Sequence, residues 1–206
     1  MATADGSRRS TPKSKIMEVI LPEIDICDTT DKVPNGAVYI IDLIAYLRSL
    51  VNVPDTFRLL AQRIVADIPA RYKVIYFACY TYNKIWIKSD EQAKRGESDE
   101  YIIRISDIRI PSNFGQFMRN GKNKERTLEL IETVLARDRN LVKERVIYFA
   151  RGDLCTRITS NGSEDVPSLT SDHVEVHSKI VYFAYHALAE NSGRPTVCCA
   201  LLGNEC

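Results

Sequence analysis

The sequence lacks long apolar runs and an excess of charge of either sign. No stretch approaches the roughly 18 apolar residues that a membrane-spanning helix needs, and segment 1–15 has no apolar core of a secretion signal. The 28 Lys and Arg residues are balanced by 27 Asp and Glu, for a formal charge of +1. No overall field therefore draws the chain to nucleic acid or to a membrane. We expect an intracellular protein, in the nucleus or the cytoplasm, without a membrane partner.

Several diagnostic motifs are also missing. The chain contains no glycine-rich dinucleotide or Walker loop and no Gly-x-Ser-x-Gly elbow, so a nucleotide cofactor or a serine hydrolase has no support. Cysteines occur without a framework that would indicate disulfides, and in an intracellular protein we expect reduced thiols. The six cysteines are Cys27, Cys79, Cys155, Cys198, Cys199 and Cys206.

The length and the apolar content predict one principal domain. With 206 residues and 45% hydrophobic content, the chain can bury one good core. Residues 1–16 are polar and basic, as in a disordered tail that either contacts phosphates or only solubilises the terminus. Residues 17–206 are then a single α/β domain.

Four apolar, β-rich runs predict strands. They have the continuous apolar character of strands that are covered on both faces, and Cys155–Thr159 is a candidate for a further strand. The four runs are Ala37–Ile41, Lys73–Cys79, Val146–Ala150 and Thr196–Leu202.

Helical periodicity alternates with these strands. It predicts two helical pieces within 45–68 that are interrupted at Pro54, a helix at Lys124–Arg139 and another at His173–Glu190. The charged stretch 84–113 reads as an arch or lid, and Asn161–Ser171 as a loop. Because parallel neighbours need long crossovers, the order predicts an α/β fold with a mainly parallel central sheet and helices on both faces.

Asp42 ends the first predicted strand, where an open parallel sheet places its ligands. The same position suits an N-cap of the following helix. The residues alone leave both roles open.

Longer motifs resemble the PIN-like (flap-endonuclease-like) nucleases. Val38-Tyr39-Ile40-Ile41-Asp42 resembles their first acidic motif, and Ile87–Gly96 resembles the arch segment of an uncharacterised metazoan branch. Asn123-Lys124 and Ser171–Lys179 match further motifs of that branch. The resemblance covers roughly 38–197 and implies a three-layer PIN-like fold.

The resemblance also implies a chemistry. PIN-like nucleases use clustered carboxylates to hold two divalent ions, usually Mg²⁺ or Mn²⁺, which activate water and stabilise the leaving oxygen. The matched positions imply catalytic roles for Asp42, Glu91 and Glu175, and metal ligation by Asp42, Glu175 and His177. They imply phosphate contacts by Lys88, Arg95 and Lys124.

Several acids of that family pattern are replaced. Tyr80 stands where an acid closes the second strand, and Val174 and His177 replace acids of the helix motif. Single base changes can produce these replacements, as in a decaying or a redirected site. His173 and His177 alternatively form an i, i+4 pair that suits Zn²⁺, Mn²⁺ or Fe²⁺, or are simply buried or capping residues.

We therefore expect a degenerate PIN-like domain that binds nucleic acid or a protein partner without catalysis and without a cofactor. The alternative is a residual nuclease that uses Mg²⁺ or Mn²⁺, and a chain without a selected role is a third reading. In either of the first two cases, Asp42, Tyr80, Glu175 and His177 should lie together at one end of the sheet, because each follows a strand or opens a helix.

Overall fold

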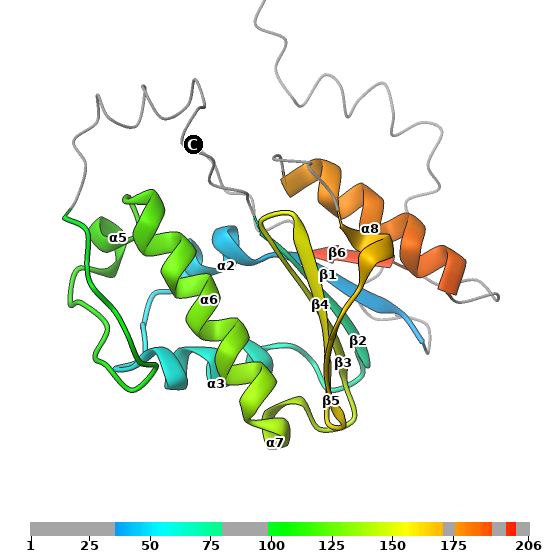
Figure 1. Cartoon of the computed structure of the whole chain (residues 1–206), viewed down its shortest axis with the longest axis horizontal. Coiled ribbons are helices and arrows are strands. Elements are labelled where there is room, and N and C mark those ends of the chain that lie inside the picture. Colours follow the sequence, from blue (N-terminus) through cyan, green and yellow to red (C-terminus); the bar gives the residue numbers. More distant parts are fainter. Residues whose placement is uncertain (1–35, 80–98, 171–175, 191–196, 201–206) are drawn as a thin grey trace, which may run out of the picture. The chain divides into compact units, whose positions relative to one another are not determined.

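The computed structural model describes residues 36–79, 99–170, 176–190 and 197–200, and within these it leaves out the side chains of His177 and of 197–200. The predicted tail at 1–16 lies outside these ranges. The described residues form an α/β unit around a six-stranded sheet in the order β5-β4-β3-β2-β1-β6 (Figure 1). The predicted α/β class is therefore confirmed.

Four of the strands run parallel and in register. They are β1 (Val38–Asp42), β2 (Val74–Ala78), β3 (Val146–Arg151) and β6 (Val197–Ala200). Val38 pairs with Val74 and with Val197, and Val74 pairs with Val146. The four predicted apolar strands are thus present and parallel to one another.

The other two strands are antiparallel, which makes the sheet mixed. β4 (Leu154–Thr159) follows β3 after Gly152 and Asp153 and pairs back along it, and β5 (Gly162–Asp165) pairs antiparallel with β4. Gly152 has a φ of +60°, a conformation that glycine adopts at little cost and that a tight turn uses.

The loop predicted at Asn161–Ser171 is therefore wrong over part of its length. This segment contains β5 and a 3₁₀ helix at Pro167–Leu169. The polar residues of β5 gave no apolar signal, because this edge strand is mostly exposed.

The helices begin at identifiable caps. Asp42 caps α2 (Leu43–Ser49), and Thr56 caps α3 (Phe57–Asp67), which confirms the break predicted at Pro54. Asn120 caps α6 (Gly121–Arg137), so this helix begins three residues before the predicted Lys124. The remaining helices are α5 (Phe114–Phe117), α7 (Arg139–Val142) and α8 (Val176–Glu190).

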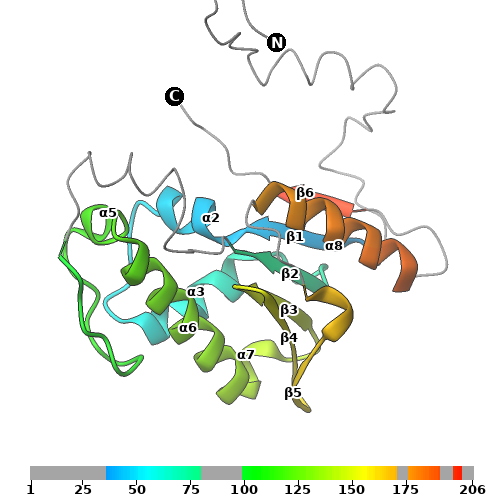
Figure 2. The same cartoon turned by 45° about the horizontal axis from the view of Figure 1, so that its top comes forward.

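Side chains of alternate strand residues pack on different helices. Ile40, Tyr76 and Tyr148 form one apolar cluster with Ile180 and Phe183 of α8. Strand residues of the opposite parity, such as Phe77 and Phe149, are also buried. Figure 2 shows α8 beside one face of the sheet and α3 and α6 beside the other.

The described part of the predicted arch, 99–113, has no helix or strand of its own apart from one isolated bridge between Thr56 and Arg109. Asn123 of α6 anchors its beginning. The Asn123 amide donates to Asp99 O (2.9 Å) and accepts from Tyr101 N (2.9 Å). Across the described residues, no helix is long and apolar enough to cross a membrane.

Candidate site at the carboxyl edge of the sheet

The carboxyl ends of the parallel strands lie at a common edge because the strands are in register. Asp42 pairs with Ala78, and Ala78 pairs with Ala150. Cys79 follows β2 directly, and Arg151 ends β3. Asp42, Cys79 and Arg151 thus belong to the edge where parallel sheets bind ligands.

Asp42 performs the structural role that the sequence left open. Its side chain is 8% exposed, and Oδ1 accepts a hydrogen bond from Ala45 N at 3.0 Å. This contact satisfies one of the amide groups that a helix start leaves without a partner. Asp42 therefore both ends β1 and caps α2.

A buried lysine approaches the same edge from α8. Lys179 is 2% exposed, and its Nζ donates to Gly152 O, in the turn after β3, at 2.7 Å. Burial lowers the pKa of Lys179, while Cys79, Asp153 and Cys155 act in the opposite direction. Lys179 brings a positive charge to this edge of the sheet.

The Cys79 thiol lies among the charges of this edge. Cys79 is fully buried, and burial raises the pKa of its thiol well above the usual range. Lys179 and Arg151 lower that pKa, and Asp42 and Glu132 raise it further. The thiol is therefore protonated at neutral pH and is neither a nucleophile nor a metal ligand in this form.

Cys155 shares this apolar environment. Burial raises the pKa of its thiol to about 12. Cys79 and Cys155 are both free thiols, as predicted for them. Cys27 and Cys206 lie outside the described residues, as do the side chains of Cys198 and Cys199.

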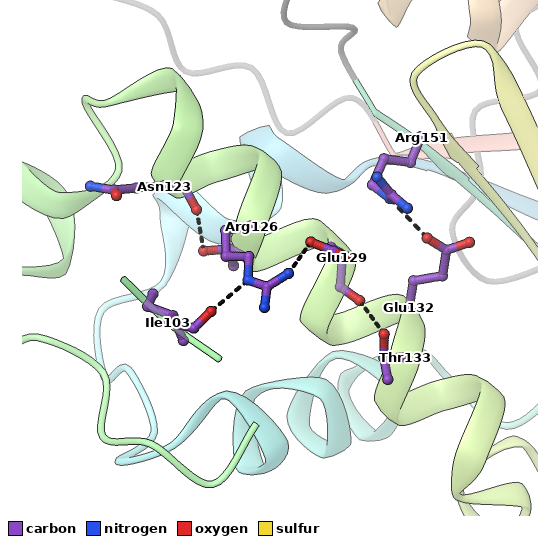
Figure 3. A network of polar contacts seen from close by, with 8 residues as sticks. Ile103, Asn123, Arg126, Glu129, Glu132, Thr133 and Arg151 are labelled. Atoms are coloured by element: carbon purple, nitrogen blue, oxygen red, sulfur yellow. Dashed lines mark hydrogen bonds and ion pairs between the residues drawn. The ribbon is translucent and has the colours of Figure 1, made fainter. Parts of the chain in front are cut away.

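An ion pair joins α6 to the sheet at this edge. Glu132 Oε2 lies 2.8 Å from Arg151 Nε (Figure 3). Glu132 Oε1 accepts from Thr156 Oγ1 at 2.8 Å. Both oxygens of the Glu132 carboxylate thus have protein partners. Glu132 thus fixes β3 and β4 against α6.

The same helix carries a second polar network. Arg126 donates to Ile103 O at 2.5 Å and pairs with Glu129, whose backbone carbonyl accepts from Thr133 Oγ1 at 2.8 Å (Figure 3). These contacts attach the described end of the arch to α6. Arg126 and Glu129 therefore have a structural role in holding this segment against α6.

Lys124, predicted to contact phosphate, lies in the first turn of α6. It is 1% exposed, and burial lowers its pKa to about 8, with the nearby Arg48 guanidinium adding to the shift. A phosphate would reach this ammonium only after neighbouring residues moved. The phosphate contact stays a prediction.

The other predicted site residues are placed only in part. His177 lies in the first turn of α8, but its side chain is not described. The predicted gathering of Asp42, Tyr80, Glu175 and His177 stays a prediction. The predicted residues outside the described ranges are Tyr80, Lys88, Glu91, Arg95, Val174 and Glu175.

Lys179, Glu132 and Arg151 of this edge were missed in the sequence. Lys179 lies three residues after Val176, and Ile180 four, so all three share the inward stripe of α8, a periodic signal that could have identified Lys179. Nothing in the sequence indicated Glu132. In the part of the chain that the structure describes, no three His, Cys, Asp or Glu side chains are arranged to hold a metal ion.

Comparison with known proteins gives no family assignment. No family model matches the chain, and neither the curated proteins nor the solved structures contain a significant match. The function is therefore inferred from the residues and the geometry.

Proposed function

We propose that this chain is a degenerate member of the PIN-like nuclease family, with a three-layer α/β fold, that binds nucleic acid or a protein partner without cleaving phosphodiesters. The observation that carries the proposal is the buried Lys179 at the carboxyl edge of the sheet. Two-metal hydrolysis needs clustered carboxylates that compensate two divalent ions. A buried ammonium raises the electrostatic cost of binding cations there.

Asp42 supports the same proposal. Its carboxylate raises the pKa of the Cys79 thiol, whereas the ammonium of Lys179 lowers it. Both groups therefore lie close enough to Cys79 to act on the same thiol. Asp42 also caps α2. The acids that the family pattern places beside it are replaced by Tyr80, Val174 and His177.

Binding of a ligand remains chemically reasonable at this edge. Parallel sheets bind ligands beyond their carboxyl ends, and at this edge Lys179 is buried against Gly152 O and Arg151 is paired with Glu132. Lys88, Arg95 and Lys124 are the proposed phosphate contacts, on the strength of the sequence resemblance. An anionic partner suits this set of residues better than a cation does.

The alternative function is a residual nuclease that uses Mg²⁺ or Mn²⁺ through Asp42, Glu91, Glu175 and His177. One observation favours it: Asp42 ends β1 at the carboxyl edge, at the position of the family's first acid. A single ion held there could polarise a phosphate. It would leave either the attacking water or the departing oxygen unsupported.

Cleavage and metal binding test the two functions directly. With Mg²⁺ or Mn²⁺, the unmodified chain should not cleave flap, single-stranded or duplex substrates above background. The double variant Tyr80→Asp/His177→Asp should bind Mn²⁺ more tightly, as measured by the EPR signal of free Mn²⁺. Adding Lys179→Met should raise that affinity further by about tenfold, because a nearby like charge is removed.

The matched control is Lys73→Met. Lys73 precedes β2, at the opposite end of the strand, and pairs with Glu144 in the solvent; its loss should leave Mn²⁺ affinity unchanged. Salt-dependent anisotropy of labelled oligonucleotides distinguishes a nucleic-acid ligand from a protein partner. Metal-dependent cleavage by the unmodified chain that Asp42→Asn abolishes would establish the alternative, since Asn preserves the helix cap.

A further inference from the structure

An open cavity of about 480 Å³ lies where the end of α2 meets α5. Leu47 and Arg48 of α2 line one side, and Met118 and Arg119, directly after α5, line the other. Figure 1 shows α2 and α5 in the same part of the molecule. The volume falls in the range of cavities that bind small ligands or a few residues of a peptide.

The walls of this cavity are aliphatic. Leu47 and Met118 are buried beneath it, and Leu50 and Val53 are half-buried in its wall. Val51 is 91% exposed at its rim. A ligand that placed an aliphatic side chain here would remove apolar surface from water, which is the main favourable term in association.

The charge around the cavity is of one sign. Arg48 and Arg119 are both exposed, and no Asp or Glu lines the cavity. Elsewhere in the described structure Arg58 and Arg126 pair with carboxylates, whereas no acid in the described ranges pairs with Arg48 or Arg119. Arg48 also acts on the buried ammonium of Lys124. The positive charge there is thus compensated by no lining residue.

We propose that this cavity binds an acidic peptide segment that carries an aliphatic side chain. Guanidinium groups hold carboxylates through paired hydrogen bonds, and Arg is enriched where proteins bind one another. The aliphatic side chain fills the wall formed by Leu50 and Val53. Arg48 and Arg119 hold the flanking carboxylates.

A nucleic-acid strand fits the same cavity less well. Single strands bind through aromatic rings on which bases stack. Phe114 is the one aromatic residue of the lining, and it is 7% exposed. None of the lining residues belongs to a strand of the sheet, so this peptide binding does not depend on the function proposed for the carboxyl edge.

Fluorescence anisotropy with the full chain tests the proposal. The probe is a short labelled peptide of Glu and Leu, compared with one in which Gln replaces Glu and one in which Ala replaces Leu. We expect the Glu–Leu peptide to bind most tightly. Arg48→Glu and Arg119→Glu should each weaken its binding by about tenfold, as for the loss of one charged contact.

Arg139→Glu is the matched control. Arg139 is exposed on α7, so its reversal changes the net charge equally without touching the cavity. Arg139→Glu should change the dissociation constant of the Glu–Leu peptide by no more than about twofold. Val51→Asp should weaken binding, and because Val51 is 91% exposed, this variant does not disturb the core.

Methyl NMR gives a readout without any variant. The peptide should shift the signals of Leu50, Val51, Val53 and Met118, while the signal of Ile158 of β4, which does not line the cavity, should not move. The proposal is overturned if the Glu–Leu peptide does not bind, if the Gln peptide binds equally well, or if Arg139→Glu weakens binding as much as Arg48→Glu. Tighter binding of oligothymidylate, lost in Arg48→Glu, would also overturn it and assign the cavity to nucleic acid.

Discussion

The parallel strands of this sheet and the antiparallel hairpin formed by β4 and β5 differ in how deeply their side chains are buried. After its first residue, β2 is buried throughout, and β3 is buried at its four central residues. β4 has only Cys155 and Ile158 buried, and β5 has no buried residue. Figure 2 shows α8, α3 and α6 beside the parallel strands, while β5 forms an exposed edge of the sheet. Strands buried on both faces must be apolar, whereas an edge hairpin need not be.

The two regions also differ in how they accommodate charge. The buried region contains Lys179 at the edge of the sheet and Lys124 in the first turn of α6, both with lowered pKa values. The hairpin keeps its charges nearer the surface, where Arg157 and Glu164 lie 2.7 Å apart with side chains that are 38% and 65% exposed. Substitutions should therefore change the free energy of unfolding far more in the buried region than in the hairpin.

The largest effect is expected from Phe77→Ala in β2. Phe77 is fully buried and contacts Phe149 edge-on, with ring centroids 5.7 Å apart. Removing this ring leaves a cavity between two strands and should lower the free energy of unfolding by about 3–5 kcal/mol. Chemical denaturation measures this loss.

The matched hairpin substitution is Leu154→Ala. Leu154 is 61% exposed, and its truncation should change stability by less than about 0.5 kcal/mol. Equal losses at Phe77 and Leu154 would mean that the hairpin is part of the same tightly packed core, contrary to its burial pattern.

An intermediate, pH-dependent effect is expected from Lys124→Met. The folded-state pKa of Lys124 is about 8, below the ordinary value of 10.5. Below pH 8 the lysine is charged in both states, so its burial cost is fully present, and Met should stabilise the fold by about 1–3 kcal/mol. Between pH 8 and 10.5 the unfolded chain binds more protons, so the stability of the unmodified chain rises toward that of the variant.

Denaturation of both proteins across pH 7 to 11 checks this convergence. Lys122→Met is the control on the same helical turn, because Lys122 is 61% exposed and pairs with Glu100. Lys122→Met should change the stability by only about 0.5 kcal/mol, because the side chain is exposed. A constant difference for Lys124→Met across this range would show that folding does not lower the pKa of Lys124.

The smallest effect is expected at the hairpin ion pair. A double-mutant cycle of Arg157→Gln and Glu164→Gln should give a coupling energy of about 0.5 kcal/mol or less, because Glu164 is exposed and Arg157 is partly so. The coupling should fall further at high salt. A coupling near 2 kcal/mol would contradict the description of the hairpin as an exposed edge.

These differences explain which parts of the fold the sequence predicted. The four apolar strands were identified because each is a continuous apolar run, and the helix break was identified from Pro54 itself. The β5 strand was taken for a loop, because Gly162–Asp165 owes its conformation to pairing with β4 and not to its own composition. Edge pairing is a tertiary contact that local periodicity does not reveal.

The candidate site was predictable only in its first residue. Asp42 was identified from its position after an apolar strand, and it lies at the carboxyl edge. The structure added Lys179, Glu132 and Arg151. These three come from α8, α6 and β3, so their proximity depends on how distant segments pack.

The sequence by itself determined the apolar strands, the main helices and the balance of charge, because periodicity and composition are local properties of the chain. Only the tertiary structure decided that Lys179 is buried beside the Asp42 edge and that Arg48 and Arg119 line one cavity. The physical reason is that burial and electrostatic environment depend on neighbours brought together by folding. The helical periodicity of α8 indicates that Lys179 faces inward, but only the packing of distant segments decides which groups it meets there.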